Sequence, residues 1–183
     1  ADDLIAHNLE ALEARGVRRI VTTCPSCYHA WKTAYPQGRV EVVHAVEFLA
    51  QAAAGGRIPW REPEGEPLVV TYHDPCDLGR KQKVYEPPRE VLRAIPGVEL
   101  REMQDHGANA LCCGGGGNLE SVDRELSAGI AALRLAQAQA TGAHILVTAC
   151  QQCQRTLAMA ARRERVRMRV WDLSQLVWER MAG

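Results

Sequence analysis

Cysteine is the residue type with the clearest chemical signal in this 183-residue sequence, which contains seven of them. An odd number cannot all pair in internal disulfides, and two adjacent cysteines are difficult to join to each other without strain. The seven comprise two Cys-x-x-Cys pairs, one adjacent pair and one lone residue: Cys24 and Cys27, Cys150 and Cys153, Cys112 and Cys113, and Cys76. Reduced thiols that serve a metal or redox site are therefore the favoured interpretation.

The elements around the cysteines follow from hydrophobic periodicity, which predicts alternating helices and strands. Strands are expected at 17–23, 40–43, 68–72, 98–103, 144–149 and 166–171. Helices are expected from residue 4 to Gly16, from Pro25 to near Pro36, and at 45–53, 88–94, 120–139, 151–163 and 173–181. Because strands that alternate with helices pair in parallel, the predicted fold is α/β with mostly parallel, doubly wound sheets.

The sequence also contains an internal repeat. Cys24 and Cys27 precede Cys150 and Cys153 by 126 residues, and similar residues flank both pairs at this offset. The second copy has a long upstream part, whereas only 23 residues precede Cys24, so the first copy lacks its front half. We expect two related lobes, an incomplete one at 1–56 and a complete one at 67–183, with a Pro- and Gly-containing linker at 57–66. Either the chain is a fragment of a longer subunit, which is the interpretation we favour, or the first site is vestigial.

Each Cys-x-x-Cys pair lies where a predicted strand ends and a helix begins. Helix N-termini lower thiol pKa values, and ligands of parallel sheets bind beyond the carboxyl ends of the strands. Cys76 also follows a strand, and Cys112 and Cys113 precede a helix. The five cysteines of the second lobe could thus converge on one point. Five thiolates exceed the four that a tetrahedral zinc ion accepts, so a polynuclear iron–sulfur centre fits them better.

The spacing of these cysteines carries a resemblance to a known family. Thirty-five residues separate Cys76 from Cys112, and 36 separate Cys113 from Cys150. Four motifs match in order: His73-Asp74-Pro75-Cys76, Tyr85-Glu86-Pro87-Pro88-Arg89, Cys112-Cys113-Gly114-Gly115-Gly116-Gly117 and Cys150-Gln151-Gln152-Cys153. Over nearly its whole length the chain resembles the CCG-domain, or cysteine-rich domain, family of iron–sulfur oxidoreductase proteins, which includes the heterodisulfide reductase B component and the glycolate oxidase iron–sulfur subunit.

The resemblance implies an electron-transfer subunit with a four-iron cluster of cubane or noncubane type. Its ligands would be Cys76, Cys112, Cys113, Cys150 and Cys153, whereas Cys24 and Cys27 match only the tail of a first motif. It implies other oxidoreductase subunits as partners: a flavoprotein, a ferredoxin-type iron–sulfur protein or a membrane subunit that reacts with quinone. Such a partner would hold a cytoplasmic chain at the inner face of the membrane. Because the first motif is incomplete, a two-cluster site for disulfide reduction cannot be assembled from these residues.

Two other function classes stay open at this point. The chain could be a zinc-stabilised module that docks a partner and catalyses nothing, with Cys24 and Cys27 supplying half of a zinc site. Alternatively, Cys24 and Cys27 could act as a thiol–disulfide oxidoreductase pair. Metal analysis distinguishes the zinc-stabilised module from an iron–sulfur protein. Serine substitutions of Cys24 and Cys76 distinguish the thiol–disulfide oxidoreductase from an iron–sulfur protein.

Several other side chains have a predicted role near the cysteines. Gly114, Gly115 and Gly116 are expected to let the backbone approach the cluster and donate amide hydrogens to its sulfurs. A phosphate-binding loop is disfavoured because no Lys-Ser/Thr follows these glycines. His73 and Asp74 either lie beside the cluster or are structural, with Asp74 capping the next turn and His73 packing against the sheet. Arg89 could face a substrate or partner, but a solvated position is expected for it. Trp31, Trp171 and Trp178 are expected to pack in the core.

Composition excludes further classes. Lys and Arg number 22, as do Asp and Glu, so the formal net charge is zero and the basic surface of a nucleic-acid binder is not expected. No apolar stretch reaches the roughly 20 residues that span a membrane. The N-terminus, Ala1-Asp2-Asp3-Leu4, is unlike a signal peptide. We therefore expect a cytoplasmic protein with no nucleic-acid partner and no membrane span of its own.

Overall fold

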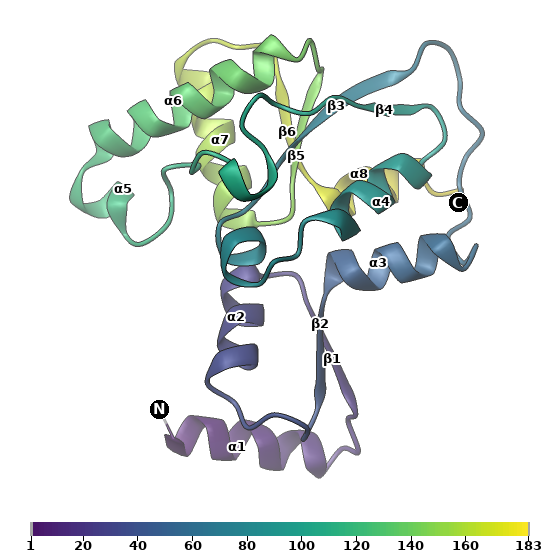
Figure 1. Ribbon diagram of the computed structural model, residues 1–183, viewed down its shortest axis with the longest axis vertical. Coiled ribbons are helices and arrows are strands. Elements are labelled where there is room, and N and C mark those ends of the chain that lie inside the picture. Colours follow the sequence, from purple (N-terminus) through teal and green to yellow (C-terminus); the bar gives the residue numbers. More distant parts are fainter. Residues whose placement is uncertain (1, 183) are drawn as a thin grey trace.

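The structure is a computed structural model that describes residues 2–182. Helices and strands alternate along the chain (Figure 1). The strands are β1 (Arg19–Thr22), β2 (Glu41–His44), β3 (Leu68–His73), β4 (Val98–Leu100), β5 (Ile145–Thr148) and β6 (Arg169–Asp172). The α-helices are α1 (Asp2–Glu13), α2 (Pro25–Thr33), α3 (Ala45–Ala54), α4 (Glu86–Ala94), α5 (Leu119–Val122), α6 (Arg124–Ala140), α7 (Gln151–Arg163) and α8 (Leu173–Arg180). A π-helical turn, η1 (Asp77–Lys81), and a 3-10 turn, η2 (Gly107–Asn109), lie in the loops.

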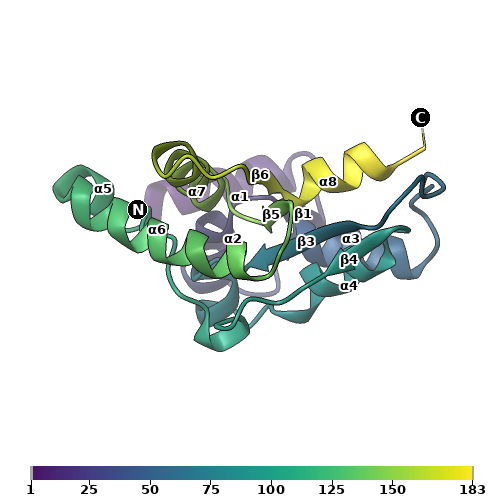
Figure 2. The ribbon, with the colours of Figure 1, turned by 90° about the horizontal axis from the view of Figure 1, so that it is seen from above.

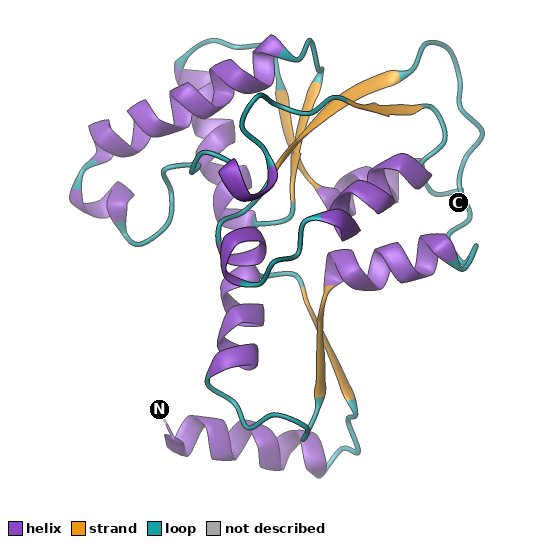
Figure 3. Ribbon diagram, viewed as in Figure 1, coloured by secondary structure: helices purple, strands orange, loops and turns teal. Residues whose placement is uncertain are grey.

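All the strand pairings within these sheets are parallel. One sheet has two strands in the order β1-β2, and the other has four in the order β4-β3-β5-β6. The smaller sheet lies between α1 and the larger unit, and the four strands of the larger sheet fan out above it (Figure 3). The prediction of an α/β fold with parallel sheets is confirmed.

Helices cover both faces of the larger sheet. On one face Val70, Tyr72 and Val147 pack with apolar side chains of α3, α4 and α8. On the other face Leu146 packs with apolar side chains of α6 and α7. Seen from above, α6 extends to one side of the strands and α8 to the other (Figure 2). Because side chains alternate along a strand, this two-sided burial requires the continuous apolar runs of β3 and β5.

The repeat recognised in the sequence has a structural counterpart. The segment β1-α2-β2-α3 has the same order as β5-α7-β6-α8, and Thr22 faces His44 as Thr148 faces Asp172. His44 closes a capping box at the start of α3, and Asp172 does the same for α8. The two segments are thus built alike, down to the residue that begins their last helix.

The two units meet beside the cysteines. The Ser26 hydroxyl donates to Asp77 Oδ2 at 2.6 Å, and the Gln151 amide donates to the Thr23 carbonyl at 3.1 Å. One apolar cluster also includes residues of both units, among them Tyr28 and Tyr72. The predicted lobe boundaries at 1–56, 57–66 and 67–183 remain a prediction.

Two local predictions were wrong. The expected helix at 120–139 is two helices, because Asp123 has an extended backbone and its carboxylate accepts from Leu126 N at 2.9 Å to cap α6. Trp178 does not pack in the core but is 73% exposed, whereas Trp31 and Trp171 are partly buried against it. No helix within residues 2–182 is long and apolar enough to cross a membrane.

Candidate metal centre

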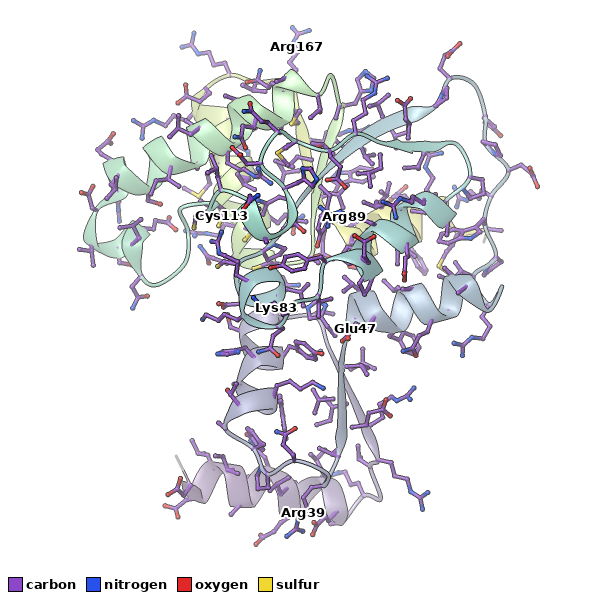
Figure 4. The ribbon with its side chains drawn as sticks, viewed as in Figure 1. Arg39, Glu47, Lys83, Arg89, Cys113 and Arg167 are labelled. Carbon is purple, nitrogen blue, oxygen red and sulfur yellow. The ribbon has the colours of Figure 1, made fainter. Side chains whose placement is uncertain are left out.

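Five cysteines converge beyond the carboxyl ends of neighbouring strands. Cys76 follows β3, and Cys150 follows β5, which pairs with β3 in parallel. Cys150 is the N-cap of α7, and Cys153 lies in the first turn of that helix. The loop between η2 and α5 adds Cys112 and Cys113; Figure 4 labels Cys113 near the start of α7. Parallel pairing is what places the ends of distant segments at one edge of the sheet.

The five sulfurs form a continuous series of thiol contacts. Cys76 contacts Cys112, Cys112 contacts Cys113, and Cys113 contacts Cys153, which contacts Cys150. Cys113 and Cys153 are buried, and the other three are partly buried. One group of potential ligand atoms, from His73, Cys113 and Cys153, has all its members within 4.8 Å of one another. The structure therefore brings together the five residues that the sequence predicted as ligands.

Crowding of the thiols shifts their pKa values in opposite directions. Hydrogen bonds from Cys113 and Cys76 hold the pKa of Cys112 well below its usual value. A hydrogen bond from the Cys153 thiol lowers the pKa of Cys150 to about 7, and backbone N–H groups of Cys153 and Gln152 add to this effect. The thiol of Cys112 raises the pKa of Cys113 to about 11. Thiols this close to one another can all be deprotonated together only when a cation compensates the negative charge of the thiolates.

Backbone amides of the glycine run point at sulfur. Gly114 N donates to Cys112 Sγ at 3.3 Å, and Gly115 N donates to Cys113 Sγ at 3.4 Å. Hydrogen bonds of this kind stabilise thiolates and sulfur-bound metal centres. Gly114 and Gly115 thus lie beside cysteine sulfurs, whereas Gly116 is exposed. Their role at a cluster stays a prediction.

The same two glycines are also required by packing against the helices. A Cβ on Gly114 would lie 2.4 Å from the Ser127 carbonyl of α6, and one on Gly115 would lie 2.0 Å from Thr156 Oγ1 of α7. Gly114 also has a φ of +81°, which favours glycine. In contrast, a Cβ on Gly116 would meet no atom within 4 Å. Close helix approach therefore explains the first two glycines independently of any bound group.

A buried ion pair joins α4 to the residue that follows β3, close to the start of η2. Arg89 donates to both carboxylate oxygens of Asp74, at 2.8 and 3.0 Å, and also pairs with Glu102. Asp74 Oδ2 further accepts from the Gly107 backbone N at 2.8 Å. The expectation that Arg89 is solvated was wrong. Arg89 is only 3% exposed, because α4 places it against Asp74. The alternative in which Asp74 caps the next turn was also wrong, because its oxygens are used by Arg89 and Gly107.

His73 and Arg134 lie behind the sulfurs, on the face of the sheet that α6 covers. His73 is buried, and its Nδ1 accepts a hydrogen bond from Arg134 Nε at 3.0 Å. Burial lowers the pKa of His73 to about 3 and that of Arg134 to about 10. At neutral pH the pair is therefore a neutral imidazole and a charged guanidinium.

The surroundings of this pair test whether the residues fit an anionic metal centre. The described partners of Arg134 are all uncharged: His73 Nδ1, the Asp105 carbonyl at 2.6 Å and Gln137 Oε1 at 2.8 Å. Arg134 Nη2 and His73 Nε2 are buried without a hydrogen-bond partner within residues 2–182. A buried cation and a buried donor left unpaired are costly. A thiolate-bound cluster, which carries net negative charge, would supply what both groups lack, so the residues fit it.

Cys24 and Cys27 occupy the equivalent strand-to-helix position in the smaller unit. Cys24 is the N-cap of α2, and its Sγ accepts from Cys27 N at 3.5 Å. Cys27 is exposed, and its hydrogen bond to Cys24 raises the pKa of the Cys27 thiol. The neighbouring Ser26 contacts Asp77, one residue after Cys76. The pair is therefore adjacent to the five-cysteine cluster but has no second set of thiols around it within residues 2–182.

Sequence reasoning missed Arg134 altogether. Arg134 lies on α6 between Ala131, Leu135 and Ala138, which are all buried. An arginine at helical spacing within an apolar face is the signal that could have found it, because such a residue must meet a partner inside the fold.

Comparison with known proteins agrees with this geometry. The family model for the cysteine-rich domain (CCG) matches residues 1–32 and 70–158. The D component of the dihydromethanophenazine:CoB–CoM heterodisulfide reductase of Methanosarcina mazei is 38% identical over 97% of this chain and 44% of its own length. The probable iron-sulfur-binding oxidoreductase FadF of Bacillus subtilis is 34% identical over 99% of this chain and 26% of its own.

A third relative extends the range of activities. The B component of the fumarate reductase (CoM/CoB) of Methanothermobacter marburgensis is 36% identical over 84% of this chain and 30% of its own length. The chain spans less than half the length of these curated relatives. The matched ranges include all seven cysteines and cover most of the chain. The chain belongs to the cysteine-rich (CCG) domain family.

Proposed function

We propose that this chain is an electron-transfer domain of an iron–sulfur oxidoreductase, with one cluster held by Cys76, Cys112, Cys113, Cys150 and Cys153. The observation that carries the proposal is the continuous series of contacts among the five sulfurs at the ends of β3 and β5. The names of the relatives, which include an iron-sulfur-binding oxidoreductase and components of two reductases, support the same reaction class.

The ligand count favours a polynuclear centre over a single ion. A tetrahedral zinc site takes four thiolates, and a fifth cysteine in contact with them would be left over. Iron–sulfur clusters are the polynuclear centres that thiolates bind most often. We propose a four-iron cluster, of cubane or noncubane type, as the occupant. When bound, it would accept and release single electrons.

The residues of this chain would tune that centre in three ways. The amides of Gly114 and Gly115 donate to ligand sulfurs, the N-terminus of α7 adds its positive dipole end, and the Arg134 guanidinium adds a buried charge. All three favour the more negative, reduced state of the site. The buried side of the cysteines also keeps water from Cys113 and Cys153. These features would therefore stabilise the reduced state of a cluster bound in this domain.

Partners and location follow from the family and remain proposals. Electron transfer requires a donor and an acceptor, and two of the relatives are components of larger reductases. We propose a flavoprotein, a ferredoxin-type iron–sulfur protein or a quinone-reactive membrane subunit as partners. The chain would then work in the cytoplasm, at the inner face of the membrane when its partner is membrane-bound.

Metal and sulfide analysis after anaerobic purification and reconstitution tests the proposal. We expect several iron atoms per chain with a similar amount of acid-labile sulfide, together with a visible absorption band that bleaches on reduction. Less than one iron per chain after reconstitution would overturn the proposal. Zinc without sulfide would instead establish the zinc-stabilised docking module.

Cys24 and Cys27 are a secondary candidate site for zinc, with two ligands supplied from elsewhere. A thiol–disulfide oxidoreductase role is less well supported, because the pKa of the exposed Cys27 thiol is raised and not lowered. That role predicts a disulfide-reducing activity that survives Cys76→Ser but is lost in Cys24→Ser. An activity with the opposite dependence would exclude it.

A further inference from the structure

We propose that His73 donates a hydrogen bond from Nε2–H to a sulfur of the metal centre, and that Arg134 fixes the imidazole in the tautomer that allows this. The inference rests on the proposed iron–sulfur function, and it assigns a specific role in that site to two residues that are not cysteines.

The tautomer follows from the hydrogen bond between the two side chains. Arg134 Nε lies 3.0 Å from His73 Nδ1. A guanidinium nitrogen can only donate, so Nδ1 must offer its lone pair. An imidazole that accepts at Nδ1 is neutral and has one ring proton, so that proton must be on Nε2.

The other ring nitrogen, Nε2, is the donor left without a partner. His73 Nε2 is buried and has no hydrogen-bond partner within residues 2–182. A ring nitrogen of His73 lies within 4.8 Å of Cys113 Sγ and Cys153 Sγ. A buried N–H without an acceptor is expensive, and thiolate or sulfide sulfur is an anionic acceptor. The unpaired donor therefore points to a sulfur-rich group that the bound state provides.

The same geometry argues against His73 as a metal ligand. A histidine nitrogen binds a metal through its lone pair, and the Nε2 atom of this tautomer carries a proton instead. Nδ1 has its lone pair committed to Arg134. His73 thus lies close to two ligands without the means to be a third, and its role is to position a proton near them.

Both residues are held rigidly, so the donor is already oriented in the fold. The His73 carbonyl accepts from Thr148 Oγ1 at 3.2 Å, which fixes the end of β3 against β5. Arg134 Nη1 donates to the Asp105 carbonyl at 2.6 Å and to Gln137 Oε1 at 2.8 Å. The guanidinium therefore cannot swing away from the ring without losing two further hydrogen bonds.

A hydrogen bond to a cluster sulfur stabilises the reduced state, because reduction places more negative charge on sulfur. Replacing His73 by leucine removes the donor without changing the charge of the site. We expect His73→Leu to weaken the preference for the reduced state about tenfold, a shift of ~59 mV to more negative potential for a one-electron couple. His73→Gln, which places an amide N–H near the position of Nε2, should recover part of the shift.

The experiment compares midpoint potentials of the reconstituted chain, measured by redox titration with electron paramagnetic resonance detection. The variants are His73→Leu and His73→Gln, with His144→Leu as the control, since His144 is an exposed histidine just before β5. The inference predicts the order wild type and His144→Leu highest, His73→Gln between, and His73→Leu lowest. A His73→Leu potential equal to that of the wild type, at full iron and sulfide content, would overturn it.

Two further readings keep the outcome unambiguous. If His73→Leu and His73→Gln both fail to load iron while the wild type loads, His73 is a ligand and the donor assignment is wrong. Long-range proton–nitrogen NMR of 15N-histidine protein, reduced and metal-free, should show the Nε2–H tautomer for His73 and its loss in Arg134→Met. An Nδ1–H tautomer would overturn the inference, whereas a wild type that binds no iron and sulfide would refute the proposed function itself.

Discussion

Asp74 accepts two hydrogen bonds from Arg89, at 2.8 and 3.0 Å, two residues before the cysteine that follows β3. Both side chains are almost fully buried, and the same carboxylate accepts from the backbone N of Gly107, which begins η2 just before the loop with Cys112 and Cys113. This pair links α4, the end of β3 and the loop that carries Cys112 and Cys113. The arrangement of the five cysteines therefore depends on an interaction between residues outside that set.

The first prediction concerns this pair. Asp74→Asn leaves a buried guanidinium with Glu102 as its remaining carboxylate partner, and breaking a buried pair typically costs about 3–5 kcal/mol. Urea unfolding of the reduced, metal-free chain should show a loss of this size. The control is Glu86→Gln, which removes the exposed pair of Glu86 with Arg93 and should cost less than about 1 kcal/mol. Equal losses in the two variants would contradict the role assigned to Asp74.

The second prediction uses three consecutive glycines. Gly114→Ala and Gly115→Ala place a methyl group against α6 and α7, so each should lower the free energy of unfolding by about 1–3 kcal/mol. Gly116→Ala, whose added Cβ meets no atom within 4 Å, should change the free energy by less than about 0.5 kcal/mol. Denaturant unfolding of the three metal-free variants checks this order, and a Gly116→Ala loss as large as the others would refute it.

The third prediction is a pH dependence that comes from His44. Burial lowers the pKa of His44 below the 6.5 that is usual for histidine, although contacts with the Thr23 backbone and Glu47 oppose the shift. Since the unfolded chain then binds a proton more readily than the folded chain, stability is full above about pH 6.5 and falls as the pH drops below it. The slope contributed by this one residue is at most about 1.4 kcal/mol per pH unit.

His44→Asn keeps a side chain that can cap α3 but removes the titrating group. Urea unfolding of the metal-free chain at pH 7.5, 6.5 and 5.5 should therefore give a shallower fall for this variant than for the wild type. His144→Asn, which changes an exposed histidine, should retain the wild-type slope. Parallel curves for His44→Asn and the wild type would show that His44 does not titrate in this way.

The fourth prediction separates the two kinds of cysteine. Cys153→Ser removes a buried sulfur that contacts both Cys113 and Cys150, so iron and sulfide content should fall to less than a third of the wild-type level. Cys27→Ser changes an exposed thiol outside that series and should leave both contents within about a fifth of wild type. Similar losses in the two variants would mean that the smaller unit shares the cluster.

Much of the candidate site could be predicted from sequence because Cys76 and the Cys150–Cys153 pair follow strongly apolar strands. Cys76 and Cys150 each follow a predicted strand, and the alternation of strands and helices predicts parallel pairing, so both were expected at one edge of the sheet. The break at Asp123 was missed, because a cap within an otherwise periodic run leaves the apolar pattern unchanged. Trp178 was misplaced because its helix presents to solvent a face that periodicity assigned to the core.

Buried charge was the least predictable feature. Arg134 contacts His73, 61 residues away in the chain, and Arg89 contacts Asp74, 15 residues away. A charged residue is buried only where a distant segment supplies its partner, and no local pattern encodes that partner. The partners of both arginines are therefore known only from the tertiary structure, in which β3, α4 and α6 lie together.

The most direct test of the central claim is the iron and sulfide content of the Cys24→Ser, Cys27→Ser double variant after anaerobic reconstitution. The variant leaves the five converging cysteines intact and removes the pair in the smaller unit. If the five alone hold the proposed four-iron cluster, iron and acid-labile sulfide should each approach about four per chain. Less than one iron per chain in a folded double variant would contradict the assignment, provided that the wild type loads iron under the same conditions.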